Sequence, residues 1–117
     1  ADLQELARTS LAVVCAGAKA ILDIGLTLEY LETHGVPVIG AGQDNFAAFY
    51  TRDSGFRADF RIDDAKAQAR FIRTKWALGL AGGVVVSTPI PEADEIPAAD
   101  IAAILRQALA DAKASGI

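Results

Sequence analysis

The sequence predicts an α/β protein with three layers, in which helices cover both faces of a largely parallel or mixed central sheet. Short, nearly all-apolar segments alternate along the chain with segments whose apolar residues recur at helical spacing. Strands separated by amphipathic helices are typical of βαβ units. The composition agrees, because 52% of the 117 residues are hydrophobic and 22% are charged. We therefore expect one α/β unit over residues 1–117.

The first part of the chain predicts a short helix, a strand and a longer helix. Asp2 and Glu5 have capping-box spacing, with Asp2 as the N-cap of a helix that ends near Arg8. Leu11–Gly17 is almost wholly apolar, as expected of a strand covered on both faces. A helix over 21–33 follows, and its apolar face is formed by Ile21, Ile24, Leu28 and Leu31.

The middle of the chain predicts two more strands and a helix. Residues 36–39 form a strand, a long irregular stretch follows, and 59–62 form a short strand. Asp63 or Asp64 caps the next helix. The buried stripe expected on that helix consists of Ala65, Ala69, Ile72 and Trp76.

The last part predicts a strand over 84–86, a proline-rich loop and a helix that starts near Asp100. The expected inner face of this helix consists of Ile101, Leu105, Ala108 and Ala112. In parallel sheets, ligands bind at the carboxyl ends of the strands. The loops expected to form a site are therefore Ala16–Ala20, Gly40–Gly55 and Ser87–Ala93.

Charge and composition exclude several classes of function. The net charge is −4, and a sequence pI of about 4.8 argues against binding to nucleic acid or to anionic membranes. No apolar run approaches the roughly 20 residues of a membrane span. Cys15 is the only cysteine, so we expect a reducing, cytoplasmic compartment. The absence of methionine suggests a fragment or a processed chain.

Lys19 is the first candidate for chemistry. It follows a buried strand in the small-residue segment AGAKA and precedes a helix. Burial and a nearby helix N-terminus would both disfavour the ammonium form, freeing the amine to attack a carbonyl-like carbon. The alternative is an ordinary solvated lysine in a loop. Asp23, four residues on, is placed to pair with Lys19 or to polarise it, and the alternative is an ordinary pair of charged residues on a helix.

Asp2 is the second candidate. Its carboxylate suits a hard divalent cation, and the alternative is the helix N-cap described above. Gly40–Asn45 (GAGQDN) begins like a dinucleotide-binding fingerprint but lacks the third glycine.

Three other sites have ordinary explanations. His34 lies in the last turn of a helix, where a positive charge is favoured, and Cys15 suits a core position. A solvated helix face accounts for the basic residues Lys66, Arg70 and Arg73.

The segment around Lys19 and its flanking sequences form a specific pattern. AGAKAILDIGLTLEYLETHGVPV, preceded by DLQELARTSLAVVC and followed by QDNFAAFYTRDSGF and KWALGLAGGVVVSTPIPEADEIP, closely resembles the pseudouridine-5′-phosphate glycosidase family. This family includes the indigoidine-synthase-A-like proteins, and the resemblance covers essentially all 117 residues. This sequence departs from the family pattern at Ala47, where a proline is usual, and at Thr88, where an asparagine is common.

The resemblance implies an enzyme that reversibly cleaves the C–C glycosidic bond of pseudouridine 5′-phosphate, giving uracil and ribose 5-phosphate. It implies that Lys19 is the catalytic nucleophile of a Schiff-base-type intermediate and that Asp2 binds a divalent metal, usually Mn²⁺. It also implies an α/β/α fold, a homotrimer, and a small-molecule substrate rather than a nucleic acid or a membrane.

Family members are much longer, so the resemblance makes this chain the central portion of such an enzyme and an incomplete part of its fold. The general-acid glutamate, an active-site asparagine and much of the phosphate pocket have no matching positions here. We therefore expect the isolated chain to be inactive. Two alternatives stay open: a non-catalytic structural or oligomerisation fragment, and another Schiff-base enzyme acting on sugar phosphates.

Overall fold

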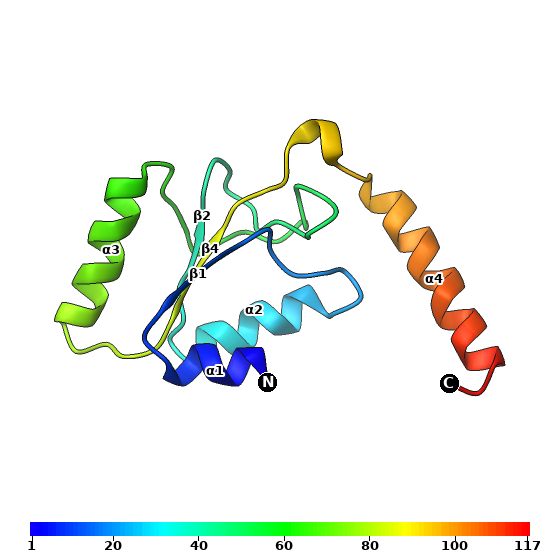
Figure 1. Ribbon diagram of the computed structural model, residues 1–117, viewed down its shortest axis with the longest axis horizontal. Helices are drawn as coiled ribbons and strands as arrows, with labels where there is room; N and C mark the ends of the chain where they lie inside the picture. Colours follow the sequence, from blue (N-terminus) through cyan, green and yellow to red (C-terminus); the bar gives the residue numbers. More distant parts are fainter.

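The chain forms a four-stranded sheet in the order β1-β4-β2-β3, with helices on both faces (Figure 1). The computed structural model describes all of residues 1–117. The strands are β1 (Ala12–Cys15), β2 (Val38–Gly40), β3 (Phe60–Arg61) and β4 (Val84–Ser87). Every pair of neighbouring strands is parallel. The predicted α/β class is confirmed, and the sheet is parallel throughout.

Alternation along the central strands sends side chains into two separate cores. Val38 and Val85 pack with α1 (Asp2–Arg8) and α2 (Ile24–Thr33) on one face. The other core holds Ile39, Val84 and Val86, against which Phe71 and Ile72 of α3 (Ala65–Ala77) pack. Because successive strand residues point to opposite faces, three short apolar strands are enough to hold three layers together. The predicted α/β/α arrangement is confirmed.

The expectation that the first strand is covered on both faces is wrong within this chain. β1 spans Ala12–Cys15 rather than Leu11–Gly17 and lies at the edge of the sheet, paired only with β4. Val14 is 69% exposed as a result. β2 also starts later than expected, at Val38, although Val36 ahead of it is buried.

The N-termini of the first two helices differ from prediction. Asp2 is not an N-cap, since α1 begins at Asp2 itself and Ala1 precedes it without a side-chain cap. Glu5 therefore does not complete a capping box. Its carboxylate accepts from the hydroxyl of Thr9 at 2.6 Å and from Arg8 at 3.3 Å, and these bonds lower the pKa of Glu5.

α2 begins at Ile24 rather than Ile21, because the side chain of Asp23 accepts a hydrogen bond from the backbone N–H of Leu26 at 2.9 Å. Ile21 is exposed in the preceding turn, so it does not belong to the apolar face of α2. Ile24 and Leu31 are buried as predicted.

α3 is capped by Asp64 as predicted, but its predicted stripe is partly wrong. Ala65 and Ala69 are exposed, and the buried residue of the helix is Lys75. The Lys75 ammonium donates to three carbonyls of the turn that follows α3, those of Leu80, Ala81 and Gly82, at 2.9, 2.9 and 3.1 Å. Burial lowers the pKa of Lys75. A helical stripe of apolar residues gives no signal for such a cation, because its ammonium binds carbonyls of the turn that follows the helix.

The last helix, α4 (Ala98–Ala114), extends away from the sheet (Figure 1). It follows a 3₁₀ turn, η1 (Glu92–Asp94), and starts two residues before Asp100. Of its predicted inner face only Ile101 is buried, while Leu105 and Ala112 are half-buried and Ala108 is exposed. None of the helices is long and apolar enough to cross a membrane.

Candidate active site

The loops after β1, β2 and β4 meet at the carboxyl edge of the sheet, as the parallel topology predicts. The N–H of Phe49 donates to the carbonyl of Ala16 at 2.9 Å, and the N–H of Thr88 donates to that of Cys15 at 2.8 Å. Gly17 and Ala48 form an isolated antiparallel bridge. We call residues 16–23 the lysine loop and residues 46–51 the aromatic loop. The two loops are therefore fixed to each other through backbone contacts.

Gly17 makes this close approach possible. Its φ is +89°, and a Cβ added there would lie 1.8 Å from the carbonyl oxygen of Ala47. No side chain fits into that space, so the aromatic loop lies directly on the backbone of the lysine loop. The glycine of the AGAK segment is thus a requirement of the site's geometry.

Ser87 fixes the aromatic loop from the side of β4. Its side-chain oxygen accepts a hydrogen bond from the N–H of Ala47 at 3.0 Å, and Ser87 is 1% exposed. Ala47 itself is completely buried. Ala47 has a backbone N–H that a proline would lack, and Ser87 satisfies it.

A second set of contacts holds the other end of the aromatic loop. Thr51 donates its hydroxyl proton to the carbonyl of Ile96 at 2.6 Å, and the N–H of Ile96 donates to the carbonyl of Tyr50 at 2.8 Å. Arg52 donates through Nη1 to the carbonyl of Ile90 at 2.7 Å. The proline-rich segment after β4 is therefore attached to the aromatic loop, so all three predicted loops belong to one assembly.

Lys19 lies beyond Gly17 in the lysine loop and is exposed, which makes the expectation of burial wrong. Its Nζ lies 5.0 Å from the centre of the Phe49 ring. It forms no salt bridge with Asp23, whose carboxylate caps α2 instead. The arrangement places a primary amine at the open carboxyl edge of the sheet, above an aromatic ring and accessible to a ligand.

Phe49 is a residue of this site that the sequence analysis did not single out. Its φ is +65°, and it is the one non-glycine residue with positive φ. A bulky residue in the left-handed region is a genuine outlier, because its Cβ crowds the following backbone. Nothing in the local sequence signals this conformation, which depends on the loops meeting in three dimensions.

Asp2 lies in the first turn of α1 and is exposed. No group of three or more His, Cys, Asp or Glu side chains is placed to bind a metal ion together. A divalent cation such as Mn²⁺ needs several oxygen ligands, so these residues do not by themselves form a metal centre around Asp2. Its role as a metal ligand stays a prediction.

The remaining candidates have structural explanations. His34 is the C-cap of α2, with its ring 4.3 Å from that of Tyr30, and Cys15 is a half-buried free thiol. The partial fingerprint of Gly40–Asn45 leads into irregular chain rather than a helix, so it lacks the helix N-terminus that a dinucleotide motif requires. The basic face of α3 is exposed, as expected: Lys66, Arg70 and Arg73.

The polar hollow beside Gly42–Asn45 has a volume of about 350 Å³ and is lined by Arg57 and Arg61 among others. Arg61 contacts Asp63 at 3.1 Å and Asp44 at 3.5 Å. Its hydrogen bond, together with one from the N–H of Gly42, lowers the pKa of Asp63. The carboxylates offset the arginines here, so the hollow carries no strong positive charge.

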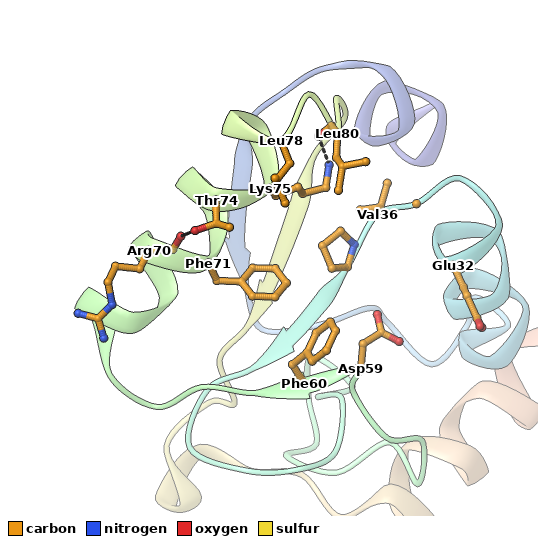
Figure 2. Close-up of a pocket in the computed structure, with 12 residues that line it drawn as sticks. Glu32, Val36, Asp59, Phe60, Arg70, Phe71, Thr74, Lys75, Leu78 and Leu80 are labelled. Atoms are coloured by element: carbon orange, nitrogen blue, oxygen red, sulfur yellow. Dashed lines mark hydrogen bonds between the residues drawn. The ribbon is translucent and has the colours of Figure 1, made fainter.

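A larger groove, about 920 Å³, lies at the opposite edge of the sheet (Figure 2). Pro37 and Asp59, at the amino ends of β2 and β3, form one wall, and α3 forms the other. Phe60 and Phe71 face each other across it, with ring centres 5.1 Å apart. Because Lys19 lies at the carboxyl ends of the strands, the groove is not part of the candidate active site.

A comparison with known protein families shows which family the chain belongs to. A family model described as indigoidine synthase A like protein matches residues 1–117. The chain belongs to the indigoidine synthase A-like family. The resemblance stated from the AGAK segment and its surroundings is therefore confirmed.

Curated relatives in this family are named pseudouridine-5′-phosphate glycosidases. The one from Cupriavidus pinatubonensis is 72% identical over 117 residues, which is all of this chain and 37% of the relative. The one from Geobacillus kaustophilus is 63% identical over 113 residues, covering 97% of this chain and 38% of the relative. The chain thus spans little more than a third of the length of these relatives.

Solved structures in the family share the fold. A crystal structure of a prealnumycin C-glycosynthase in complex with ribulose 5-phosphate matches with a TM-score of 0.92 and 40% identity, covering 99% of this chain and 38% of the other. An indigoidine synthase A-like protein from Thermotoga maritima matches with a TM-score of 0.83 and 32% identity, covering 90% and 36%. The edge strands and the projecting α4 thus belong to a family fold that is more than twice as long.

Proposed function

We propose that the full-length protein containing this chain reversibly cleaves the C–C glycosidic bond of pseudouridine 5′-phosphate, with Lys19 as the nucleophile. The observation that carries the proposal is the position of Lys19: an accessible amine at the carboxyl edge of a parallel sheet, on a loop fixed to two others. The names of the relatives supply the substrate. A C-glycosynthase with a bound sugar phosphate is a structural neighbour.

The chemistry suits an amine better than a pair of carboxylates. A C–C glycosidic bond has no leaving oxygen to protonate, so the usual glycosidase mechanism does not apply. The neutral amine of Lys19 forms a bond to the anomeric carbon as the bond from that carbon to the ring oxygen breaks. The nitrogen then gives up a proton and the ring oxygen takes one up, which leaves a neutral secondary amine on an opened sugar.

The nitrogen lone pair then drives the second step. As it forms the iminium, the bond to the uracil carbon breaks, and that carbon takes up a proton. Water hydrolyses the iminium and releases ribose 5-phosphate. The proton donors in these steps have no matching positions in residues 1–117, so they come from elsewhere in the full-length protein. Uracil release from pseudouridine 5′-phosphate tests the proposal; adduct formation at Lys19 without uracil release would favour another Schiff-base reaction.

We also propose Asp2 as one oxygen ligand of a divalent cation such as Mn²⁺, with the other ligands outside these 117 residues. In the full-length protein, Asp2→Asn is expected to weaken Mn²⁺ binding at least about tenfold and to lower uracil release similarly. The unfolding free energy should change by less than about 1 kcal/mol, because Asp2 interacts only with the helix dipole and makes no capping bond. Calorimetric titration with Mn²⁺ and thermal unfolding measure these effects.

Asp100→Asn is the matched control for Asp2→Asn, since Asp100 is also an exposed acid in the first turn of a helix. It should leave Mn²⁺ binding unchanged. Equal Mn²⁺ affinity in the Asp2 variant and the parent would remove Asp2 from the metal site.

The isolated chain of 117 residues is expected to release no measurable uracil, even with Mn²⁺ present. By the family resemblance, the general acid and much of the phosphate pocket lie outside it, and positioning of the substrate supplies a large part of such rate enhancements. Exposed apolar side chains on both edge strands, such as Val14 and Phe60, should also make it associate. A uracil assay and light scattering measure both effects; turnover close to that of a full-length relative would contradict this prediction.

The homotrimer implied by the resemblance and the cytoplasmic location expected from the single cysteine are also proposals for the full-length protein. Light scattering of that protein tests the first, and fractionation of the cells that produce it tests the second.

A further inference from the structure

Phe49 combines two features that core packing does not explain. It holds a left-handed backbone conformation, with φ +65°, although it is a bulky residue. It is also 38% exposed, and one face of its ring is turned to the ammonium of Lys19 at 5.0 Å. Strain of this kind is unfavourable and persists only where the surroundings enforce it, which is often at functional sites.

The surroundings of Phe49 enforce the conformation from several sides. Its own N–H donates to the carbonyl of Ala16 at 2.9 Å, and the N–H of the preceding Ala48 donates to the carbonyl of Thr51 at 2.9 Å. Ala48 also bridges to Gly17 in the lysine loop. These bonds attach the backbone of Phe49 to the loop that carries Lys19, so the backbones of the two residues are held in a fixed relation.

We propose that Phe49 is a positioning residue for Lys19, and that its ring stabilises the cationic nitrogen of the Lys19 adduct. The inference rests on the proposed function, because it assumes that Lys19 forms an iminium. An aromatic face attracts a cation through its quadrupole, weakly at exposed sites and more strongly where water is excluded.

The difference between exposed and water-free sites makes this contact useful for catalysis. In the free protein the ammonium is exposed, so the ring contributes little. A sugar phosphate bound over Lys19 excludes water, and the same ring then faces the iminium. An interaction that is stronger in the adduct than in the free protein accelerates formation of the adduct.

The test uses the full-length protein, trapping of the iminium by borohydride in the presence of ribose 5-phosphate, and three variants. Phe49→Tyr keeps the aromatic face. Phe49→Leu keeps apolar bulk without it, and Phe49→Asn suits the left-handed backbone but has no ring.

Phe49→Tyr is expected to trap within about twofold of the parent rate. The Leu and Asn variants should both be slower by about tenfold, equivalent to about 1.4 kcal/mol. The ribose 5-phosphate concentration for half-maximal trapping should stay within about twofold, because the phosphate is bound elsewhere.

Three results would overturn the inference. The first is parent-like trapping in the Leu or the Asn variant, and the second is a higher ribose 5-phosphate concentration for half-maximal trapping with an unchanged maximal rate. The third is a Phe49→Tyr variant as slow as Phe49→Leu. If strain alone mattered, the Asn variant would react at least as fast as the parent. Thermal unfolding shows whether each variant is folded, and the Asn variant decides the question if the Leu variant is not. If the parent protein forms no adduct at Lys19, the proposed function is rejected as well. If the adduct forms at the same rate in the parent and in the Phe49 variants, this inference alone is rejected.

Discussion

Lys19→Ala in the full-length protein is expected to lower uracil release from pseudouridine 5′-phosphate by about three orders of magnitude or more, as loss of a covalent nucleophile typically does. Folding should be little affected, because Lys19 is exposed and its side chain contacts the protein chiefly through the face of Phe49. Steady-state uracil release and thermal unfolding measure the two effects.

Lys19→Arg separates the nucleophile from the charge. Arginine keeps a cation that can lie over the Phe49 ring, but its guanidinium stays protonated and does not act as a nucleophile. We expect it to fold like the parent and to be as inactive as Lys19→Ala. A Lys19→Arg variant that retained a tenth of the parent rate would show that Lys19 acts as a positive charge rather than as an amine.

Gly17→Ala is expected to destabilise the full-length protein by more than about 4 kcal/mol, in the range that marks a specific steric conflict. The new Cβ would lie 1.8 Å from the Ala47 carbonyl oxygen, and φ at this position is +89°. To relieve the clash, the aromatic loop must separate from the lysine loop, which also removes the ring of Phe49 from Lys19. Urea unfolding of the full-length protein measures the effect.

Gly35→Ala is the matched control. Gly35 also has a positive φ, +68°, but a Cβ there meets nothing within 4 Å. This substitution should cost only the backbone term, about 1 kcal/mol. Equal losses of stability in the two variants would mean that backbone conformation, and not the contact between the loops, makes glycine necessary at position 17.

Most of the fold was predictable because the apolar pattern determines it. Val84–Val86 is buried in both cores as expected, and the three loops chosen from the parallel topology do converge. The exposure of Val14 was not predictable, because an apolar strand has the same composition whether its neighbour is present or lies in another part of a longer protein. The same reason applies to α4, whose apolar face is largely uncovered.

The wrong predictions about helix ends and helix burial have a different origin. Asp2 and Asp23 are equally good cap residues by type, and only the path of the chain decides that Asp23 caps a helix while Asp2 lies inside one. Lys75 is buried because three carbonyls of a turn surround its ammonium, a feature that no periodicity reports. These side chains are placed by tertiary contacts rather than by local propensity.

The candidate site was predictable in part. Lys19 was chosen from the AGAK segment, and the structure brings it to the expected edge of the sheet, although exposed rather than buried. Phe49 was missed, because its relation to Lys19 depends on a left-handed backbone and on contact between loops 30 positions apart in sequence.

Mapping of the trapped adduct tests the central claim most directly. The full-length protein is incubated with ribose 5-phosphate, treated with borohydride, digested with trypsin and analysed by mass spectrometry. Reductive alkylation of Lys19 blocks cleavage there, so the account predicts one modified peptide that spans residues 9–52, carrying a single reduced ribose 5-phosphate. Absence of that peptide, or a stoichiometric adduct on any other lysine, would contradict the assignment of Lys19 as the nucleophile.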